Sequence, residues 1–340
     1  MQEQMGRAII RLVPTPDNFE LLVPDPSTLH APHFAAGRFF QPWGQVRRGI
    51  PDLLRWKLAT NRHAAAKRRQ PEIPWLANDG SSLGRRVDGL EATWVGHATF
   101  ALHAGEQVIL TDPHFGPRAL LPPRLSPPGL PVDAVPAGAV ALLSHNHYDH
   151  LDEWTLARMP KGVAWMVPLG LGAFVRQRGF DVVHELDWWE SARHGDWTFT
   201  CVPAQHWSRR LGAGENTALW CGWVAENGVS RVYFAGDTGY FHGFAEIGRR
   251  FPGLDLALLP IGAYEPRWFM GAVHMNPADA LLAFRDLGAR VALPMHWGCF
   301  DLTDEPVDLA PRVWRELLDR EGVDPARGPV LAVGETWRSS

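Results

Sequence analysis

The chain has few cysteines and no strong charge of either sign. Its 340 residues include only three cysteines, Cys201, Cys221 and Cys299, and no C-x-x-C pair. This odd, sparse set argues against a disulfide framework and against a thiolate zinc site, so we expect Cys299 to be a small packed residue. The formal net charge is −4, which argues against nucleic acid as a partner because proteins that bind it carry a basic excess.

Long apolar runs are also absent. No stretch approaches the roughly 18 uninterrupted apolar residues that a membrane-spanning helix needs. Residues 1–20 lack a basic start followed by an apolar segment, so we expect no secretory signal and a cytoplasmic protein. There is no G-x-S-x-G elbow, P-loop or Rossmann glycine fingerprint, which removes three common signatures of hydrolases and nucleotide-binding enzymes.

The composition is that of a globular protein with a distinct N-terminal part. Hydrophobic residues make up 46% and charged residues 21% of the chain, close to the average of folded domains. There are 16 Trp, most of which we assign to the core, although tryptophan also suits interfaces with membranes. Residues 1–90 are rich in proline and in basic and aromatic residues. We interpret them as an extension packed on or beside a catalytic domain of residues 91–340.

The extension contains a basic segment, residues 47–69, that has two interpretations. Leucines and Trp56 alternate there with a single carboxylate, Asp52, and with eight cations: Arg47, Arg48, Arg55, Lys57, Arg62, Lys67, Arg68 and Arg69. One interpretation is a basic amphipathic helix on an anionic membrane, which would make the protein peripheral at the inner membrane surface. The other is a solvated helix that packs its apolar stripe on the main domain.

From Leu90 onward, short apolar runs alternate with helical patterns. We predict strands at residues 91–95, 99–102, 108–110, 165–168, 182–186, 197–202, 218–224, 231–235, 255–259 and 291–294. We predict helices at residues 153–159, from residue 169 to about Gly179, and at residues 277–286. Strands that alternate with helices indicate a layered α/β domain.

The most informative segment is Ser144–Asp152, which contains the pattern H-x-H-x-D-H. Six consecutive residues supply three imidazoles and one carboxylate, on His145, His147, Asp149 and His150. This donor set suits Zn²⁺, Fe or Mn²⁺. Because the apolar run 139–143 precedes it, we expect the cluster on a loop at the end of a strand, where alternate side chains can face two neighbouring cations.

Three more candidate ligands follow strand-like runs further along the chain. His206, Asp237 and His296 each come after an apolar run, with a glycine or proline within three residues. Seven ligands are too many for one tetrahedral ion and suit two ions that share a carboxylate. Asp237 is the expected bridge because a carboxylate has two oxygens. A balanced division gives one ion His145, His147 and His206, and the other Asp149, His150 and His296.

Two further residues, His97 and Asp112, are expected to support the ligands from behind. A carboxylate that accepts the second N–H of a ligand histidine fixes the tautomer and orientation of that histidine. Ordinary hydrogen bonding at a strand end is the alternative role for both residues. Two cations about 3.5–4 Å apart can hold a bridging hydroxide, so hydrolysis at this centre would require no protein nucleophile.

The order H-x-H-x-D-H, then distant His, Asp and His, resembles the metallo-β-lactamase superfamily. The resemblance implies a four-layer αββα sandwich with a two-metal site at one edge of its two sheets. Longer runs are similar to the N-acyl-phosphatidylethanolamine-hydrolysing phospholipase D family, including its bacterial relatives. These runs are residues 94–99, 111–113, 144–152, 167–171, 185–190, 234–240 and 260–270.

The family resemblance also implies a reaction and its participants. The expected reaction cleaves the head-group-side phosphodiester of N-acyl-phosphatidylethanolamine to phosphatidic acid and an N-acylethanolamine, with two Zn²⁺ ions as cofactors. The resemblance implicates Tyr148 and His274 in holding the phospholipid, and Asp149 and His274 in catalysis. A helix-capping role is the alternative for His274. The resemblance further implies a homodimer.

Departures from the family leave the substrate open. The better-known eukaryotic members have glutamine where this chain has Val273, and they differ again at Met275-Asn276. The main alternative is a metal-dependent lactonase or other carboxylic-ester hydrolase, because the same hydroxide can attack a carbonyl. A nuclease would need a basic groove with stacking aromatic residues. The non-enzymatic alternative is a membrane-associated binding module that retained a metal site.

Overall fold

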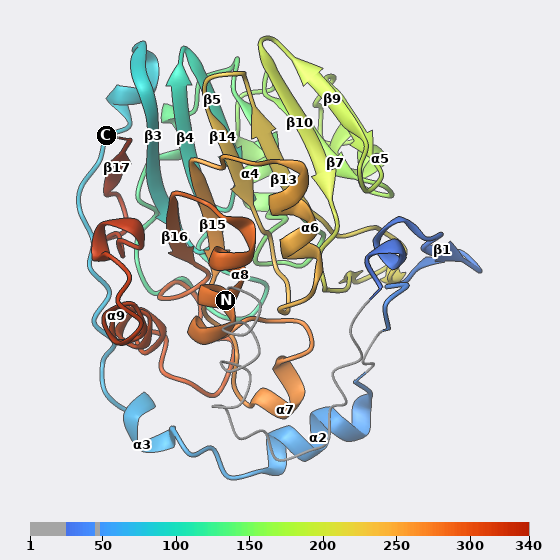
Figure 1. The fold of residues 1–340 in the computed structure, drawn as a ribbon, viewed down its shortest axis with the longest axis vertical. Coiled ribbons are helices and arrows are strands. Elements are labelled where there is room, and N and C mark those ends of the chain that lie inside the picture. The colour runs from blue at the N-terminus through green and yellow to red at the C-terminus, as the bar shows by residue number, and fades with distance from the viewer. Residues whose placement is uncertain (1–24, 45–47, 340) are drawn as a thin grey trace, which may run out of the picture.

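Two β-sheets pack face to face at the centre of the molecule (Figure 1). The computed structural model describes residues 25–44 and 48–339. One sheet has seven strands in the order β17-β3-β4-β5-β6-β7-β8, and the other has six in the order β16-β15-β14-β13-β10-β9. Central strands of both sheets, such as β6, β7 and β15, are buried along their whole length. Such strands read as continuous apolar runs because both of their faces are covered.

The seven-stranded sheet combines an antiparallel and a parallel half. Strands β17, β3, β4 and β5 pair antiparallel, whereas β5, β6, β7 and β8 pair parallel. Its strands are Thr336–Arg338 (β17), Val87–Gly96 (β3), Thr99–Gly105 (β4), Gln107–Thr111 (β5), Val140–Leu142 (β6), Ala164–Pro168 (β7) and Val183–Leu186 (β8).

The six-stranded sheet has the same mixed character. Strands β9, β10, β13 and β14 pair antiparallel, and β14, β15 and β16 pair parallel. Its strands are Val291–Met295 (β16), Leu256–Pro260 (β15), Arg231–Phe234 (β14), Gly222–Glu226 (β13), Trp197–Val202 (β10) and Ser191–His194 (β9). A separate short hairpin, β11 (Arg209–Arg210) and β12 (Gly214–Glu215), follows β10.

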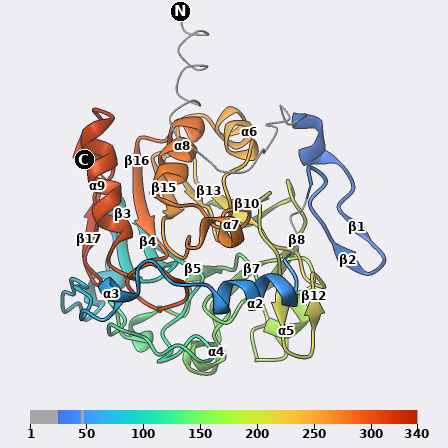
Figure 2. The ribbon, with the colours of Figure 1, turned by 90° about the horizontal axis from the view of Figure 1, so that it is seen from below.

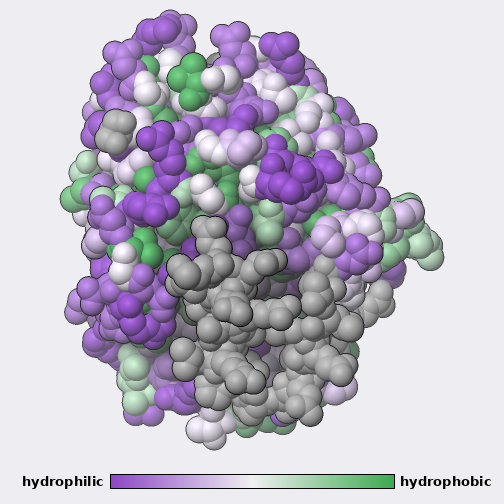
Figure 3. All heavy atoms as spheres, in the orientation of Figure 1, coloured by the Kyte–Doolittle hydropathy of each residue, from purple (hydrophilic) through white to green (hydrophobic). Residues whose placement is uncertain are grey.

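Helices cover the outer faces of both sheets, as Figure 2 shows from below. Helices α6 (Gly243–Arg250), α8 (Pro277–Leu287) and α9 (Ala310–Arg320) lie on the six-stranded sheet, and α4 (Glu153–Arg158) and α5 (Gly172–Arg176) lie on the other. The face that carries α6, α8 and α9 is largely hydrophilic, with scattered hydrophobic areas (Figure 3), because each helix buries only one side. The predicted four-layer αββα sandwich is confirmed.

Several predicted boundaries differ from the structure. The predicted strand 218–224 begins only at Gly222, because the preceding backbone bonds to loops of the other sheet: Cys221 N–H donates to the Ser144 carbonyl at 3.0 Å. The helix expected up to Gly179 ends at Arg176. Strands β9 and β17 and helices α6 and α9 were not predicted.

The described part of the extension runs along the surface of the sandwich (Figures 1 and 2). Its elements are a 3-10 turn (Pro26–His30), β1 (Phe34–Ala35), β2 (Arg38–Phe39), α2 (Ile50–Leu58) and α3 (Ala64–Lys67). Strand β3 then begins at Val87. The division into residues 1–90 and 91–340 stays a prediction, and residues 1–24 and 45–47 lie outside the described residues.

The expectation of one helix over residues 47–69 is wrong for the part that the structure describes. Helix α2 ends at Leu58 and α3 starts at Ala64. Asn61 forms the break, because its side-chain oxygen accepts the N–H of His63 at 2.7 Å and its amide donates to the Asp304 carbonyl at 3.1 Å. An asparagine that bonds its own backbone two residues ahead favours a turn over a helix. Within the described residues, no helix combines the length and apolar character needed to cross a bilayer.

Candidate metal centre

The seven predicted ligands meet at one edge of the two sheets. Strand β6 leads into the H-x-H-x-D-H loop, and β10, β14 and β16 lead to His206, Asp237 and His296. In Figure 1 this edge is the lower one, above α7 (Arg267–Met270) and α2. The carboxyl ends of strands from both sheets therefore place side chains from distant parts of the sequence in one small volume.

The first group of ligands consists of three imidazoles. Nδ1 of His147 lies 2.8 Å from Nε2 of His145 and 3.2 Å from Nε2 of His206. Two ligand atoms bound to one tetrahedral Zn²⁺ at 2.0–2.1 Å lie roughly 3.3 Å apart. Three ring nitrogens converging on one point at this spacing therefore fit a single ion, and they are the three that the sequence assigns to one metal.

The second group contains Asp149, His150 and His296. The two Nε2 atoms of His150 and His296 are 3.3 Å apart, and they lie 3.5 and 3.6 Å from Oδ2 of Asp149. These donor atoms fall within 4.8 Å of one another, and His97 belongs to the same group. This spacing suits a second ion held by two imidazoles and a carboxylate.

Asp237 stands between the two groups. Its Oδ2 lies 3.1 Å from Nε2 of His150 and 3.8 Å from Nε2 of His206, while its Oδ1 lies 3.0 Å from Nε2 of His296. Asp237 is 3% exposed, so the carboxylate is held away from solvent. Its contacts with both groups suit the bridging role that the sequence predicts for it.

Charge is distributed unevenly over the centre. Burial, together with neighbouring histidines, lowers the pKa of His147 to about 3, and burial lowers that of His206 to about 4. Burial also opposes the charged form of His296, but Asp237 and Asp149 outweigh it and raise the pKa of His296 to about 9. The first group is thus a set of neutral imidazoles with free lone pairs, the form that binds metal ions.

Buried partners orient the ligand histidines from behind. Asp112 is fully buried and accepts hydrogen bonds at 2.6 Å from Nδ1 of His150 and from the N–H of Ser144. The Ser144 hydroxyl lies 2.9 Å from Nδ1 of His145, and the Val273 carbonyl lies 3.0 Å from Nδ1 of His206. Each contact fixes a ring so that Nε2 faces the centre. Neither Ser144 nor the Val273 carbonyl was predicted from the sequence to support a ligand.

His97 contacts the second group directly. Its Nε2 lies 3.1 Å from Oδ2 of Asp149, and its ring centroid lies 4.0 Å from that of His296. Burial, and then the charge of His296, lowers the pKa of His97 to about 3. A neutral His97 can donate one N–H to the carboxylate while leaving the charge of Asp149 available to a metal.

The two predicted substrate-binding residues lie beside the centre. Nδ1 of His274 is 3.9 Å from Oδ2 of Asp237. His274 does not cap α8, because the Asn276 side chain accepts the N–H of Asp279 at 2.8 Å and fills that role. Tyr148 extends from the metal loop, and its hydroxyl accepts the N–H of Leu211 at 3.2 Å.

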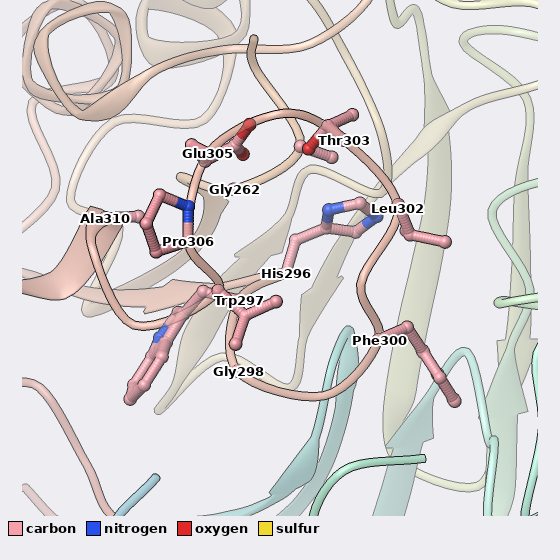
Figure 4. A pocket seen from close by; sticks show the side chains of 12 residues that line it. Gly262, His296, Trp297, Gly298, Phe300, Leu302, Thr303, Glu305, Pro306 and Ala310 are labelled. Carbon is pink, nitrogen blue, oxygen red and sulfur yellow. The ribbon is translucent and has the colours of Figure 1, made fainter. Parts of the chain in front are cut away.

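His296 projects into a pocket that is lined by loops 262–263 and 297–307 (Figure 4). Phe300, Leu302, Thr303 and Glu305 surround it there. Cys299 lies in the same loop, but its Sγ is buried 2.9 Å from Nη1 of Arg124 and belongs to none of the groups of potential ligands among the described residues. This contact agrees with the expectation that Cys299 is packed.

Comparison with known proteins gives the family. A family model described as a beta-lactamase superfamily domain matches residues 107–297, a range that contains every predicted ligand. The chain belongs to the metallo-β-lactamase superfamily. Within this superfamily it is 37% identical over 272 residues to N-acyl-phosphatidylethanolamine-hydrolyzing phospholipase D 1 of Caenorhabditis elegans, covering 74% of this chain and 76% of the relative. The predicted resemblance is confirmed.

Other relatives extend this picture. An uncharacterised protein of Mycobacterium tuberculosis is 39% identical over 280 residues, covering 79% of this chain and 72% of its own length. Among solved structures, a possible metal-dependent hydrolase from Veillonella parvula superposes with a TM-score of 0.62 at 17% identity, over 74% of this chain and 100% of that one. The latter likeness shows the shared fold alone. The chain is a metal-dependent hydrolase with a His/Asp cluster able to hold metal ions.

Proposed function

We propose that this chain is a two-zinc phosphodiesterase that cleaves N-acyl-phosphatidylethanolamine to phosphatidic acid and an N-acylethanolamine. The observation that supports it most is the pair of ligand groups that share Asp237, whose oxygens lie 3.0 Å from His296, 3.1 Å from His150 and 3.8 Å from His206. Two bound cations would stabilise the phosphate oxygens and lower the pKa of a water between them. The imidazole and carboxylate donors would also accept Fe or Mn²⁺.

Four residues around the metal ions have further roles in the proposed hydrolysis. Asp149, which His97 holds at 3.1 Å, would accept a proton from the water that attacks phosphorus. As the P–O bond to the N-acylethanolamine breaks, that proton would pass to the departing oxygen. His274 presents Nδ1 to the centre and binds an oxygen of the phosphate or of the leaving group. Tyr148, which lies within the metal loop between His147 and Asp149, binds the substrate beside the centre. Asp112 keeps Nε2 of His150 directed at the metal through its 2.6 Å contact with Nδ1.

The choice of a phospholipid is supported by the relatives and by the surface beside the site. The C. elegans relative, and a mitochondrial relative of Saccharomyces cerevisiae that is 36% identical over 247 residues, are both named for hydrolysis of this lipid. The yeast alignment covers 68% of this chain and 52% of the relative. No observation in the site favours a lactone over a phosphodiester, so the lactonase stays as an outcome of the assay.

Helix α2 supplies a surface suited to an anionic membrane. Trp56 is its one buried side chain and packs on Phe269, with ring centroids 4.9 Å apart, in a cluster with Ala263 and Met270. These partners belong to the segment that leads to His274, so α2 is attached beside the site. Its outward residues remain exposed, with Ile50 at 75% and Leu58 at 84%.

Basic residues accompany this apolar face. Arg55 lies over the Trp268 ring at 4.4 Å and Lys57 over the Trp56 ring at 3.8 Å. Apolar side chains flanked by cations suit the headgroup region of a bilayer with anionic lipids, where each cation near the surface contributes about 1 kcal/mol. We propose that α2 brings the site to the inner membrane surface and that the enzyme works there as a homodimer.

A hydrolysis assay on purified protein of known metal content tests the reaction. The substrates are N-acyl-phosphatidylethanolamine in detergent, bis(p-nitrophenyl) phosphate and a lactone panel, with Asp149→Asn and His296→Ala as variants. Release of N-acylethanolamine that disappears in both variants supports the proposal. Lactone turnover without phosphodiester cleavage, on protein with two metals per chain, would replace it by the lactonase.

Vesicle flotation tests the membrane contact separately. Wild-type protein should float with vesicles containing phosphatidylserine and much less with phosphatidylcholine alone. Leu58→Glu should weaken flotation, whereas Val229→Glu, at an equally exposed turn between β13 and β14, should not. Equal flotation of both variants would remove α2 from the proposal, and light scattering after size exclusion would give the oligomeric state.

A further inference from the structure

Strand β11 of the short hairpin β11–β12 contains a buried arginine, Arg210, that contacts the metal loop. Arg210 is 7% exposed. Its Nη1 donates to the carbonyl oxygens of Asn146 at 3.2 Å and Leu151 at 2.9 Å, and its Nη2 donates to Oε1 of Glu153 at 3.1 Å. No role was predicted for this arginine from the sequence.

The two carbonyls that Arg210 joins enclose the metal loop. Asn146 follows the first ligand, His145, and Leu151 follows the last, His150. One guanidinium nitrogen therefore connects the beginning and the end of the turn that presents four ligands. A guanidinium is planar and has five fixed donors, so it can bond two carbonyls and a carboxylate at once, which a lysine ammonium on a flexible stem does poorly.

The same arginine also orients Tyr148. Its guanidinium carbon lies 4.2 Å from the centroid of the Tyr148 ring, within the range of a cation–π contact. The next residue, Leu211, donates its N–H to the Tyr148 hydroxyl at 3.2 Å. Because that bond uses an oxygen lone pair, the hydroxyl hydrogen stays available to a second partner, such as a phosphate oxygen.

We propose that Arg210 is a positioning residue that holds the loop of residues 145–150 in its metal-binding shape and fixes Tyr148 beside it. The inference rests on the metal centre of the proposed function and is independent of which substrate is cleaved. Partners behind metal ligands typically affect metal affinity or activity by about 10- to 100-fold, and a buried arginine that joins both ends of the ligand loop belongs to this class.

Metal binding tests this role without reference to turnover. Zinc affinity is measured by competition with a chromophoric chelator, and the visible spectrum of the Co²⁺-loaded protein reports ligand geometry. Arg210→Ala should lower zinc affinity by about 10- to 100-fold and alter the cobalt spectrum. Added methylguanidinium should restore part of both, and Arg210→Lys should recover little because an ammonium cannot reproduce the fork.

Two variants separate this role from general effects of charge. Arg209→Ala removes the neighbouring exposed arginine, and Glu153→Gln removes the ion pair but keeps the carbonyl bonds. Both should keep zinc affinity within about twofold, because the charges of Arg209 and Glu153 are exposed to solvent and solvated charges contribute little. If Arg210→Ala does not fold, Arg210→Lys provides the comparison.

The outcomes distinguish this inference from the proposed function. Wild-type zinc affinity and an unchanged cobalt spectrum in Arg210→Ala and Arg210→Lys would overturn the positioning role, as would an equal loss in Arg209→Ala. Wild-type protein that binds no metal would instead overturn the proposed function. A bis(p-nitrophenyl) phosphate assay adds a further readout: misplacement of Tyr148 should raise KM in Arg210→Lys beyond the change in kcat.

Discussion

Replacing Asp112 by asparagine keeps the shape of a buried side chain and removes one acceptor. The Asp112 carboxylate accepts hydrogen bonds from the N–H and hydroxyl of Ser144 and from Nδ1 of His150. An amide has one oxygen and one NH₂ group. If the oxygen keeps the Ser144 N–H, the NH₂ faces Nδ1 of His150. Two donors cannot bond, so the stable arrangement puts the His150 proton on Nε2.

That change of tautomer should weaken metal binding by His150. Nε2 of His150 lies 3.1 Å from Oδ2 of Asp237 and 3.3 Å from Nε2 of His296, so it is the atom that faces the ion. A proton there occupies the lone pair that would bind the metal. We expect zinc affinity to fall about 10- to 100-fold, equivalent to about 1.4–2.8 kcal/mol. Metal-free protein should also lose about 1–3 kcal/mol for the unsatisfied buried contact.

Zinc competition with a chromophoric chelator and thermal unfolding of metal-free protein measure the two effects separately. Asp308→Asn is the matched control, because Asp308 is another buried carboxylate that bonds Arg69, Arg312 and the backbone of Glu72. It should lower the unfolding temperature and leave zinc affinity unchanged. Zinc affinity of Asp112→Asn within twofold of wild type would refute the tautomer argument.

Three further predictions concern the bridge and the extension. Asp237→Ala should lower the metal content from two ions per chain to one or fewer, by elemental analysis, because both ligand groups lose their shared carboxylate. Trp56→Ala should detach α2 from the domain and lower the free energy of unfolding by about 3 kcal/mol. Limited proteolysis should then cleave residues 48–69 faster than in the wild type. Burial opposes the charged forms of both His33 and Asp187, but the hydrogen bond and charge attraction between them outweigh burial, so the His33 pKa is raised and the Asp187 pKa is lowered. The stabilisation from His33 is fully present below pH 6.5 and is lost as the pH rises through the raised pKa of His33 in the folded protein. Urea unfolding should therefore show a smaller difference in the free energy of unfolding between pH 6 and pH 9 for His33→Gln than for the wild type.

The central strands could be predicted from the sequence because burial on both faces gives continuous apolar runs. Strand β15, Leu256–Pro260, is buried throughout and was predicted to within one residue at each end. Edge strands give a weaker signal, since β9 alternates exposed and half-buried residues and β17 has only three residues. Helix α9 was missed although Trp314, Leu317 and Leu318, which are buried, have helical spacing. That signal was present in the sequence.

The extension shows where local pattern and tertiary contact diverge. Its alternating cations and leucines predict one amphipathic helix, but Asn61 ends the pattern by bonding both His63 and the Asp304 carbonyl. The second bond joins residues 243 positions apart. The Asp304 carbonyl that holds Asn61 therefore cannot be predicted from the helix propensity of residues 47–69.

The same limit separates the metal ligands from the residues that hold them. The seven predicted ligands stand out because each is a histidine or aspartate at the end of an apolar strand, so residue type and position both signal chemistry. Arg210 bonds two backbone carbonyls, at separations of 64 and 59 residues from Asn146 and Leu151. A carbonyl is present at every position, so no residue type marks the partner, and an arginine beside a glycine-rich turn resembles any solvated cation. The pairing exists only because β6 and β10 bring the metal loop and the hairpin to the same edge. A double variant tests this directly: in Arg210→Ala, adding Tyr148→Phe should produce little further loss of bis(p-nitrophenyl) phosphate hydrolysis, because the ring has already lost its position. Additive losses would mean that Tyr148 is held independently of Arg210.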